Sequence, residues 1–70
     1  MKKTMKVSGM TCMHCKMRVE KALKALEGVE NVMVDLTLGQ ATFEAASTVD
    51  DLTLKNAVKD AGYKPGKIEG

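Results

Sequence analysis

Hydrophobic residues repeat with two different periods along the chain, and the change of period separates strands from helices. Three short segments alternate apolar and polar residues, which predicts strands with one buried face at residues 4–8, 32–36 and 41–45. Two longer segments place apolar residues on one face of a helix, with Cys15, Val19, Ala22, Leu23 and Leu26 in the first and Leu54, Ala57, Val58 and Ala61 in the second. A last strand is predicted over residues 63–68.

The resulting order, β-α-β-β-α-β, predicts an α+β fold of the ferredoxin-like type. It is a sandwich in which two helices cover one face of a four-stranded antiparallel sheet. Residues 37–40 are predicted to form a hairpin turn, Ser47–Asp51 to provide the N-cap of the second helix, and Gly28 and Gly62 to end the two helices. Pro65 lacks an N–H donor, so the last strand must lie at an edge, be short, or be broken there.

Length and composition limit the chain to one small domain over residues 1–70. With 70 residues, 44% hydrophobic and 29% charged, a multidomain enzyme is excluded. No apolar run is long enough to span a bilayer, and the segment after the basic start is not a signal-peptide stretch. We therefore expect a cytoplasmic protein with reduced thiols, without direct membrane insertion.

Charge is unevenly distributed. Residues 1–25 contain seven Lys and Arg against one Glu, whereas residues 26–70 contain four against eight acids. The total of +2, with one Tyr and one Phe, gives no support for nucleic-acid binding. Four basic residues are predicted to face water on the first helix: Lys16, Arg18, Lys21 and Lys24. They are either an ordinary solvated face or a docking surface for an acidic partner. The uneven distribution of charge along the chain favours docking.

Methionines gather near the same region, with five of the six in the first 17 residues. Met13 and Met17 are expected to be exposed. They form either a soft apolar rim that a partner covers or a chance accumulation.

Two cysteines three positions apart are the candidate chemical site. Cys12 is expected in the loop after the first strand and Cys15 in the first turn of the first helix. Both sulfurs can then converge on the unpaired N–H groups and the positive end of the helix dipole. A helix N-terminus lowers a thiol pKa, so both become available as metal ligands at neutral pH.

Two soft thiolates on a loop suit an ion that accepts two ligands, and Cu(I) is the obvious cellular case. A structural Zn(II) site needs four ligands, which one chain assembles with difficulty, although a dimer sharing four cysteines could supply them. A thioredoxin-like oxidoreductase also uses C-x-x-C at a helix start, but its fold normally needs a longer chain. No catalytic acid or nucleophile constellation is evident, so we do not expect an enzyme.

The heptapeptide Gly-Met-Thr-Cys-Met-His-Cys at residues 9–15 resembles the G-M-T/S-C-x-x-C motif of the heavy-metal-associated domain family, and its C-x-H-C form resembles bacterial copper chaperones in particular. The resemblance extends over essentially the whole chain, with further matches at residues 29–32, 39–42 and 60–63. It implies a Cu(I) carrier that delivers to a metal-binding domain of a copper-transporting P-type ATPase, or one such domain. Pro65 departs from the usual residue in the last strand.

Three further side chains are candidates for an auxiliary role at the metal. Met10 is expected to pack into the core, as the family implies, rather than to act as a thioether ligand. His14 is expected to face solvent, with direct coordination or a role in a copper-bridged dimer as the alternative. The resemblance to bacterial members implies that the ring of Tyr63 shields the sulfurs, and simple edge packing is the alternative.

The function favoured by these observations is a copper chaperone that binds one Cu(I) through Cys12 and Cys15 and passes it on by ligand exchange. The chain is expected to be a monomer without metal. The alternatives are an N-terminal domain excised from a copper ATPase, a Hg(II), Zn(II) or Cd(II) binder, and a thiol redox protein.

Overall fold

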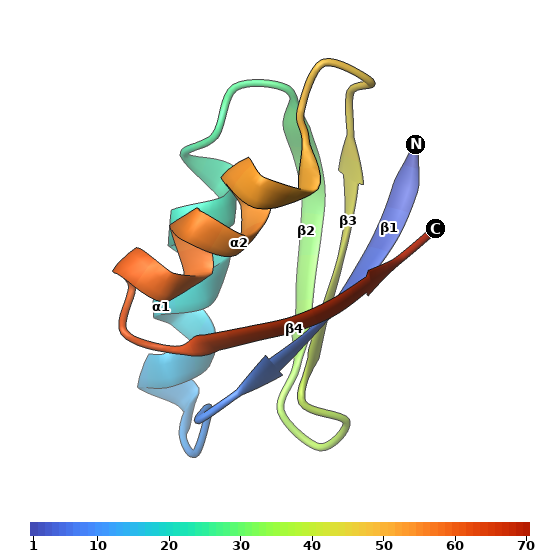
Figure 1. Ribbon diagram of the computed structural model, residues 1–70. Helices are drawn as coiled ribbons and strands as arrows, with labels where there is room; N and C mark the ends of the chain where they lie inside the picture. Colours follow the sequence, from blue (N-terminus) through green and yellow to red (C-terminus); the bar gives the residue numbers. More distant parts are fainter.

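A computed structural model describes residues 1–70 and contains six elements in the predicted order (Figure 1). These are β1 (Lys2–Ser8), α1 (Met13–Lys24), β2 (Val29–Asp35), β3 (Gln40–Ala45), α2 (Asp51–Asp60) and β4 (Lys64–Glu69). No helix is long and apolar enough to cross a lipid bilayer.

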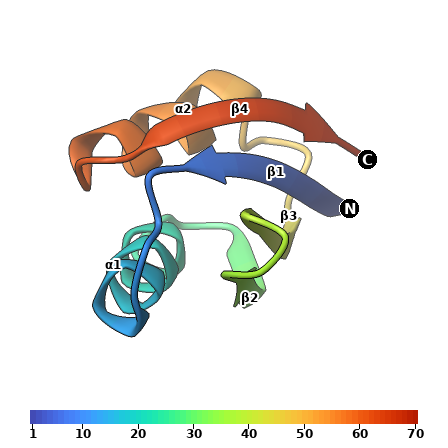
Figure 2. The ribbon, with the colours of Figure 1, turned by 90° about the horizontal axis from the view of Figure 1, so that it is seen from below.

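The strands form one sheet in the order β2-β3-β1-β4, and every neighbouring pair is antiparallel. Both helices lie on the same side of the sheet, with α1 packed against β2 and α2 against β4 (Figures 1 and 2). The predicted ferredoxin-like arrangement is confirmed. Since β4 pairs only with β1, the strand with Pro65 lies at an edge, as its missing N–H requires.

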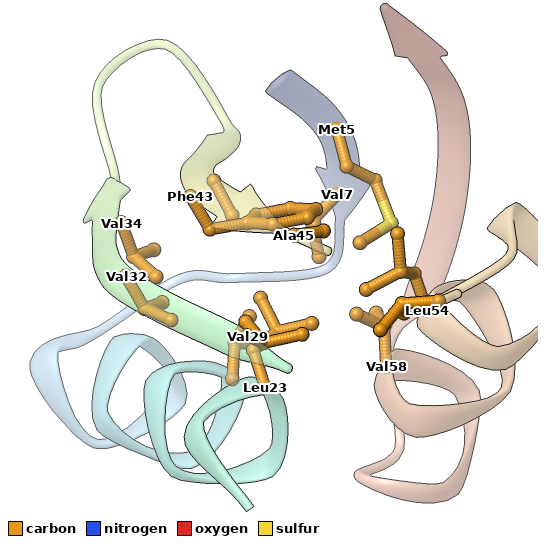
Figure 3. Close-up of a cluster of buried hydrophobic side chains, with 13 residues drawn as sticks. Met5, Val7, Leu23, Val29, Val32, Val34, Phe43, Ala45, Leu54 and Val58 are labelled. Atoms are coloured by element: carbon orange, nitrogen blue, oxygen red, sulfur yellow. The ribbon is translucent and has the colours of Figure 1, made fainter. Parts of the chain in front are cut away.

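The core lies between the helices and the sheet (Figure 3). Its largest fully buried side chains are Phe43, Met5, Leu23, Leu54, Val19 and Val58. Alternate residues of β1 and β3 enter this layer, so the predicted period-two pattern is confirmed there. Fully burying a side chain of this size contributes about 1.5–3 kcal/mol, and this burial holds α1 against the sheet.

β2 contains one irregularity, which lies at the start of the strand, while Val32 and Val34 are both buried as predicted. Val29 and Val32 are both buried although they are an odd number of residues apart. The register with β3 shifts between Glu30 and Met33, and Asn31 lies in the left-handed region with φ of 52°. This bulge turns both valines to the core. The strand then ends at Asp35, so Leu36 lies outside it and is half-buried.

The predicted end of the first helix at Gly28 is wrong. α1 ends at Lys24, and its C-cap residue Ala25 keeps a right-handed conformation, so Leu26 lies beyond the helix. Gly28 has φ of +89° in the turn into β2, and a Cβ there would lie 2.9 Å from Cγ2 of Val49. The glycine therefore serves a tight turn and a close approach of two loops.

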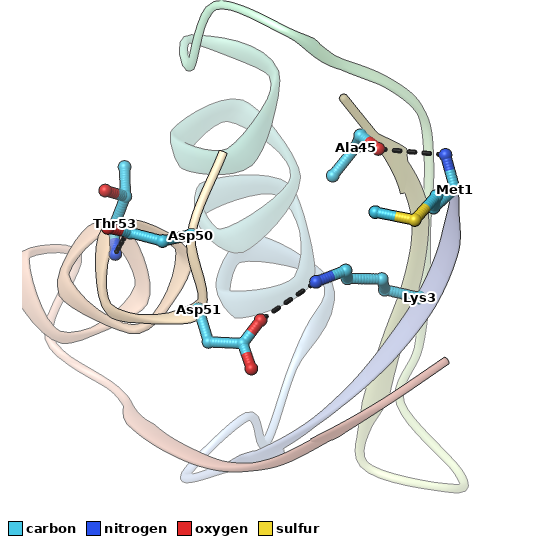
Figure 4. Close-up of polar contacts among 6 residues, drawn as sticks. All are labelled: Met1, Lys3, Ala45, Asp50, Asp51 and Thr53. Atoms are coloured by element: carbon cyan, nitrogen blue, oxygen red, sulfur yellow. Dashed lines mark hydrogen bonds and ion pairs between the residues drawn. The ribbon is translucent and has the colours of Figure 1, made fainter. Parts of the chain in front are cut away.

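The start of α2 is fixed by polar contacts (Figure 4). Asp50 is the N-cap, and its Oδ1 accepts the backbone N–H of Thr53 at 2.8 Å. The hydrogen bonds from Thr53 hold the pKa of the Asp50 carboxyl below its usual value. Asp51 forms an ion pair of 3.0 Å with Lys3 of β1, which ties the start of α2 to the sheet.

A separate contact fixes the start of the chain. The terminal ammonium of Met1 donates to the carbonyl of Ala45, at the end of β3, at 2.9 Å.

The end of α2 sets the position of Tyr63. The N–H of Gly62 donates to the carbonyl of Lys59 at 3.0 Å, and the N–H of Tyr63 donates to the carbonyl of Val58 at 3.2 Å. This is a Schellman motif, with Gly62 in the left-handed region at φ of +98°, and the predicted helix end there is confirmed. The chain consequently reverses at Tyr63 and enters β4.

Replacing Leu23 by alanine is expected to lower the free energy of unfolding by about 2–5 kcal/mol, because it empties a fully buried site under α1. Urea unfolding followed by circular dichroism measures the change. The matched control is Leu52→Ala, at a position that is 66% exposed, where a change within about 0.5 kcal/mol is expected. Equal losses at the two positions would contradict the packing described here.

Candidate metal centre

The cysteines lie where the chain passes from β1 into α1. Cys12 is the N-cap of α1 with an extended backbone, φ of −153° and ψ of 172°, and its carbonyl accepts the N–H of Lys16 at 3.1 Å. Its side chain caps no N–H group. Cys15 lies in the first turn of the helix, and the two Sγ atoms are 3.4 Å apart. The backbone therefore brings both sulfurs to the amino end of α1, next to the unpaired N–H groups of its first turn.

The two sulfurs differ in their freedom. Both cysteines are free thiols, but Cys12 is exposed and Cys15 is half-buried. Cys15 is held by the regular backbone of α1, whereas Cys12 belongs to the preceding loop. An ion or an incoming ligand consequently reaches Cys12 first, and Cys15 is the more fixed of the pair.

The pKa of the Cys15 thiol is lowered from 9.0 to about 6. The largest cause is the hydroxyl of Tyr63, which donates a hydrogen bond to the sulfur, followed by the backbone of Thr11 and the thiol of Cys12. The pKa of Tyr63 is raised, because its proton is held by the Cys15 sulfur. Cys15 is therefore a thiolate at neutral pH, in the state in which it can bind a metal.

Tyr63 comes from the opposite end of the chain. The turn after α2 brings it to the loop between β1 and α1, where Gly9 has φ of +93°. A Cβ at Gly9 would lie 3.7 Å from Cδ1 of Tyr63, so the ring lies over this loop. The loop after α2 therefore returns to the cysteine loop and places the Tyr63 ring beside it.

The other two auxiliary candidates do not lie with the sulfurs. No group of three His, Cys, Asp or Glu side chains is placed to hold one metal ion. His14 is exposed and lines a hollow on the outer surface of α1. Met10 is half-buried and packs against the core, as preferred from the sequence. The structure therefore brings together Cys12, Cys15 and Tyr63.

Three of the four predicted basic residues, Arg18, Lys21 and Lys24, are exposed and line the same hollow as His14 and Met17. We call these three residues the basic face of α1. The prediction that Lys16 faces water together with these three residues is wrong. Two residues on a helix differ by roughly 200° about its axis, which places Lys16 on the opposite side from Arg18, and it is half-buried.

The predicted exposure of the methionines is confirmed, at 58% for Met13 and 62% for Met17. α1 begins at Met13, and Cys15 is its third residue, so Met13 and His14 are helical. Both methionines therefore lie on the surface of α1 close to the cysteines.

Sequence reasoning missed two contributors to the site. The backbone of Thr11 lowers the pKa of Cys15, and the Arg18 side chain donates a hydrogen bond to the Tyr63 hydroxyl, which opposes the rise of its pKa. Arg18 follows Cys15 by three residues on α1, a spacing that places two side chains on neighbouring turns. This spacing was visible in the sequence, but the presence of Tyr63 beside it depends on the fold.

Comparison with known proteins finds similarity to metal-handling proteins over most of the chain. Residues 4–64 match the family model of the heavy-metal-associated domain. The chain is 46% identical over 66 residues to Copper-transporting ATPase 2 of Rhizobium meliloti (strain 1021), covering 93% of this chain and 8% of that protein. It is 41% identical over 58 residues to Copper chaperone CopZ of Staphylococcus aureus (strain MRSA252), covering 81% of this chain and 85% of that one.

Among solved structures, oxidized MerP from Ralstonia metallidurans CH34 has a TM-score of 0.89 and 32% identity, covering 100% of this chain and 97% of that one. The chain spans only 8% to 10% of the length of the two copper-transporting ATPases of Rhizobium meliloti and the mercuric reductase of Bacillus cereus that it matches. Activities of those whole proteins therefore involve regions that have no counterpart in these 70 residues.

Replacing Tyr63 by phenylalanine is expected to raise the pKa of Cys15 from about 6 towards 9.0, since the variant removes the hydroxyl that donates to the sulfur. Ultraviolet absorbance of the thiolate, followed against pH in the reduced protein, measures the change. If the Cys15 thiol of the Tyr63→Phe variant still loses its proton at the same pH, the hydroxyl does not act on Cys15.

Proposed function

Because the chain belongs to the heavy-metal-associated domain family, we propose that it carries one Cu(I) between Cys12 and Cys15 and delivers it to a metal-binding domain of a copper-transporting P-type ATPase. The observation that supports this most directly is the pair of free sulfurs 3.4 Å apart at the amino end of α1. As part of the proposal we place the carrier in the cytoplasm, where free thiols persist.

The donor set supports Cu(I) over a structural Zn(II). Thiolate is a soft ligand, and soft ligands select Cu(I), whereas zinc is almost always bound by four ligands in structural sites. Here no third or fourth His, Cys, Asp or Glu side chain gathers at the two sulfurs. A single chain thus offers two ligands, which suffices for Cu(I) and leaves room for a ligand from a partner.

The unequal exposure of the cysteines supports the proposed transfer by ligand exchange. A sulfur of the partner bonds to the ion on its open side, and the bond to the exposed Cys12 breaks, while Cys15 holds the ion until the second exchange. The copper keeps its oxidation state throughout. No bond of a substrate is made or broken, so the proposed activity is that of a carrier and not of an enzyme.

The basic face of α1 is the proposed docking surface. Arg18, Lys21 and Lys24 lie along the helix that begins at the cysteines, with the exposed Met13 and Met17 beside them. Opposite charges on a partner domain would speed the encounter and orient the two metal sites. Without metal we propose a monomer, and a dimer bridged by metal when the sulfurs of two chains share one ion.

Specific observations support two other functions. The match to Copper-transporting ATPase 2 covers 93% of this chain, which fits a domain within such an ATPase. The likeness to MerP and to a mercuric reductase favours Hg(II) as the second candidate ion. Competition of Cu(I), Zn(II) and Hg(II) for the reduced protein, read by mass spectrometry, separates these ions. A reduction-potential measurement and an insulin-reduction assay test a thiol redox role.

Anaerobic titration in competition with a Cu(I)-specific chelator is expected to show one Cu(I) per chain that the chelator does not remove, and this tightly held ion is lost when both cysteines are replaced by serine. The apparent affinity should fall as the pH falls through about 6, because protons then compete with the ion for the Cys15 sulfur. His14→Ala serves as the matched control and should retain the affinity. Unchanged uptake by the double serine variant would refute the proposed site.

Reversing the charge of Lys21 with Lys21→Glu is expected to slow Cu(I) transfer to an acidic ATPase domain by about two- to tenfold, a part of the roughly 10- to 1,000-fold that electrostatic steering supplies. Stopped-flow measurements at several salt concentrations record both the rate and its decline with salt. Lys67→Glu makes the same charge change on β4, at a side chain that is 80% exposed, and should matter much less. Equal effects of the two variants, or a rate independent of salt, would exclude docking through α1.

A further inference from the structure

Three potential metal ligands, two soft thioethers and one imidazole, lie on the outer surface of α1, close to the cysteine pair but separate from it. They are Met13, His14 and Met17. The methionines are 58% and 62% exposed, and the imidazole is exposed as well. Because none of the three side chains is used in core packing, their sulfur and nitrogen atoms are available to solvent.

The periodicity of α1 places Met17 next to both Met13 and His14. Met13 and Met17 are four residues apart, and His14 and Met17 are three apart, spacings at which Cβ atoms lie about 5–6 Å from each other. Long side chains of a helix point back towards its amino end, so the Met17 thioether leans over the turn that carries the other two. His14 and Met17 line the same hollow.

We infer that Met13, His14 and Met17 form a second binding site for a monovalent soft cation, Cu(I) or Ag(I), on the outer surface of α1. Thioethers are soft ligands that select Cu(I), and imidazole also binds copper. This site does not require the cysteines, and it therefore goes beyond the carriage of copper proposed above.

The charges around the site make it the weaker of the two. None of the three ligands is an anion, and the hollow is lined by Arg18, Lys21 and Lys24 against the single carboxylate of Glu20, so the positive charge of the ion is only partly compensated. The first ion should therefore bind the thiolates and the second should bind here.

The test is a titration of the Cys12→Ser/Cys15→Ser full-length chain with silver nitrate, followed by NMR of methyl-labelled methionines and of the His14 ring. We expect the Met13 and Met17 methyl signals and the His14 signals to move together and to saturate at one ion per chain. Met33 is the internal control, because it is 73% exposed on β2 and distant in sequence from the other two.

Two variants in the same background make the test specific. Met17→Leu should weaken binding by about 10-fold or more, since even loss of an outer-shell partner changes metal affinity by about 10- to 100-fold. Met33→Leu should leave it unchanged. Shifts of Met33 equal to those of Met13 and Met17, or an unaltered affinity in Met17→Leu, would overturn the site.

The cysteine-containing protein gives an independent measurement, which decides the matter if the serine variant does not fold. A first equivalent of Ag(I) should leave the Met13 and Met17 methyl signals close to their starting positions, and a second should move them. Absence of that second step overturns the inference. Failure of thiolate binding alone would instead appear as methionine shifts from the first equivalent, which refutes the copper carriage proposed above and leaves the second site standing.

Discussion

The contact between two sulfur atoms 3.4 Å apart at the amino end of α1 is the constraint on which the candidate site depends. Cys12 holds the N-cap position, where Ser, Thr, Asp or Asn would normally accept an N–H of the first turn. Its sulfur forms no such bond, so the N–H groups and the positive end of the helix remain available to stabilise a thiolate. The position thus gives up a capping interaction and keeps a free thiol at the helix end.

The rest of the fold keeps that helix end in place and open. Val19 and Leu23 are fully buried and hold α1 against the sheet. The loop between β1 and α1 lies at the end of the molecule away from both termini (Figure 1). The Schellman motif at the end of α2 brings Tyr63 from the far end of the chain to the same loop. Stability therefore comes from the helix–sheet layer, and the chemistry comes from the loops at one end.

The element order, the alternation of buried residues in the strands and the position of the two cysteines at a helix start could be predicted from the sequence, because each depends on neighbours in the chain. Two features of the fold depended on tertiary contacts and were missed. The bulge at Asn31 follows from pairing with β3, and Gly28 is required by Val49 from a distant loop. Tyr63 beside the sulfurs was expected from the family resemblance, and its hydrogen bond to Cys15 arises only after folding. Lys16 was assigned to the wrong surface although helix periodicity alone separates it from Arg18.

Copper-edge X-ray absorption of the protein loaded with one equivalent of Cu(I) shows most directly whether the two sulfurs alone hold the ion. A first shell of two sulfur ligands and no nitrogen is expected, since His14 lines a hollow on the outer surface of α1. A shell that contains imidazole nitrogen, or no sulfur, would contradict this coordination.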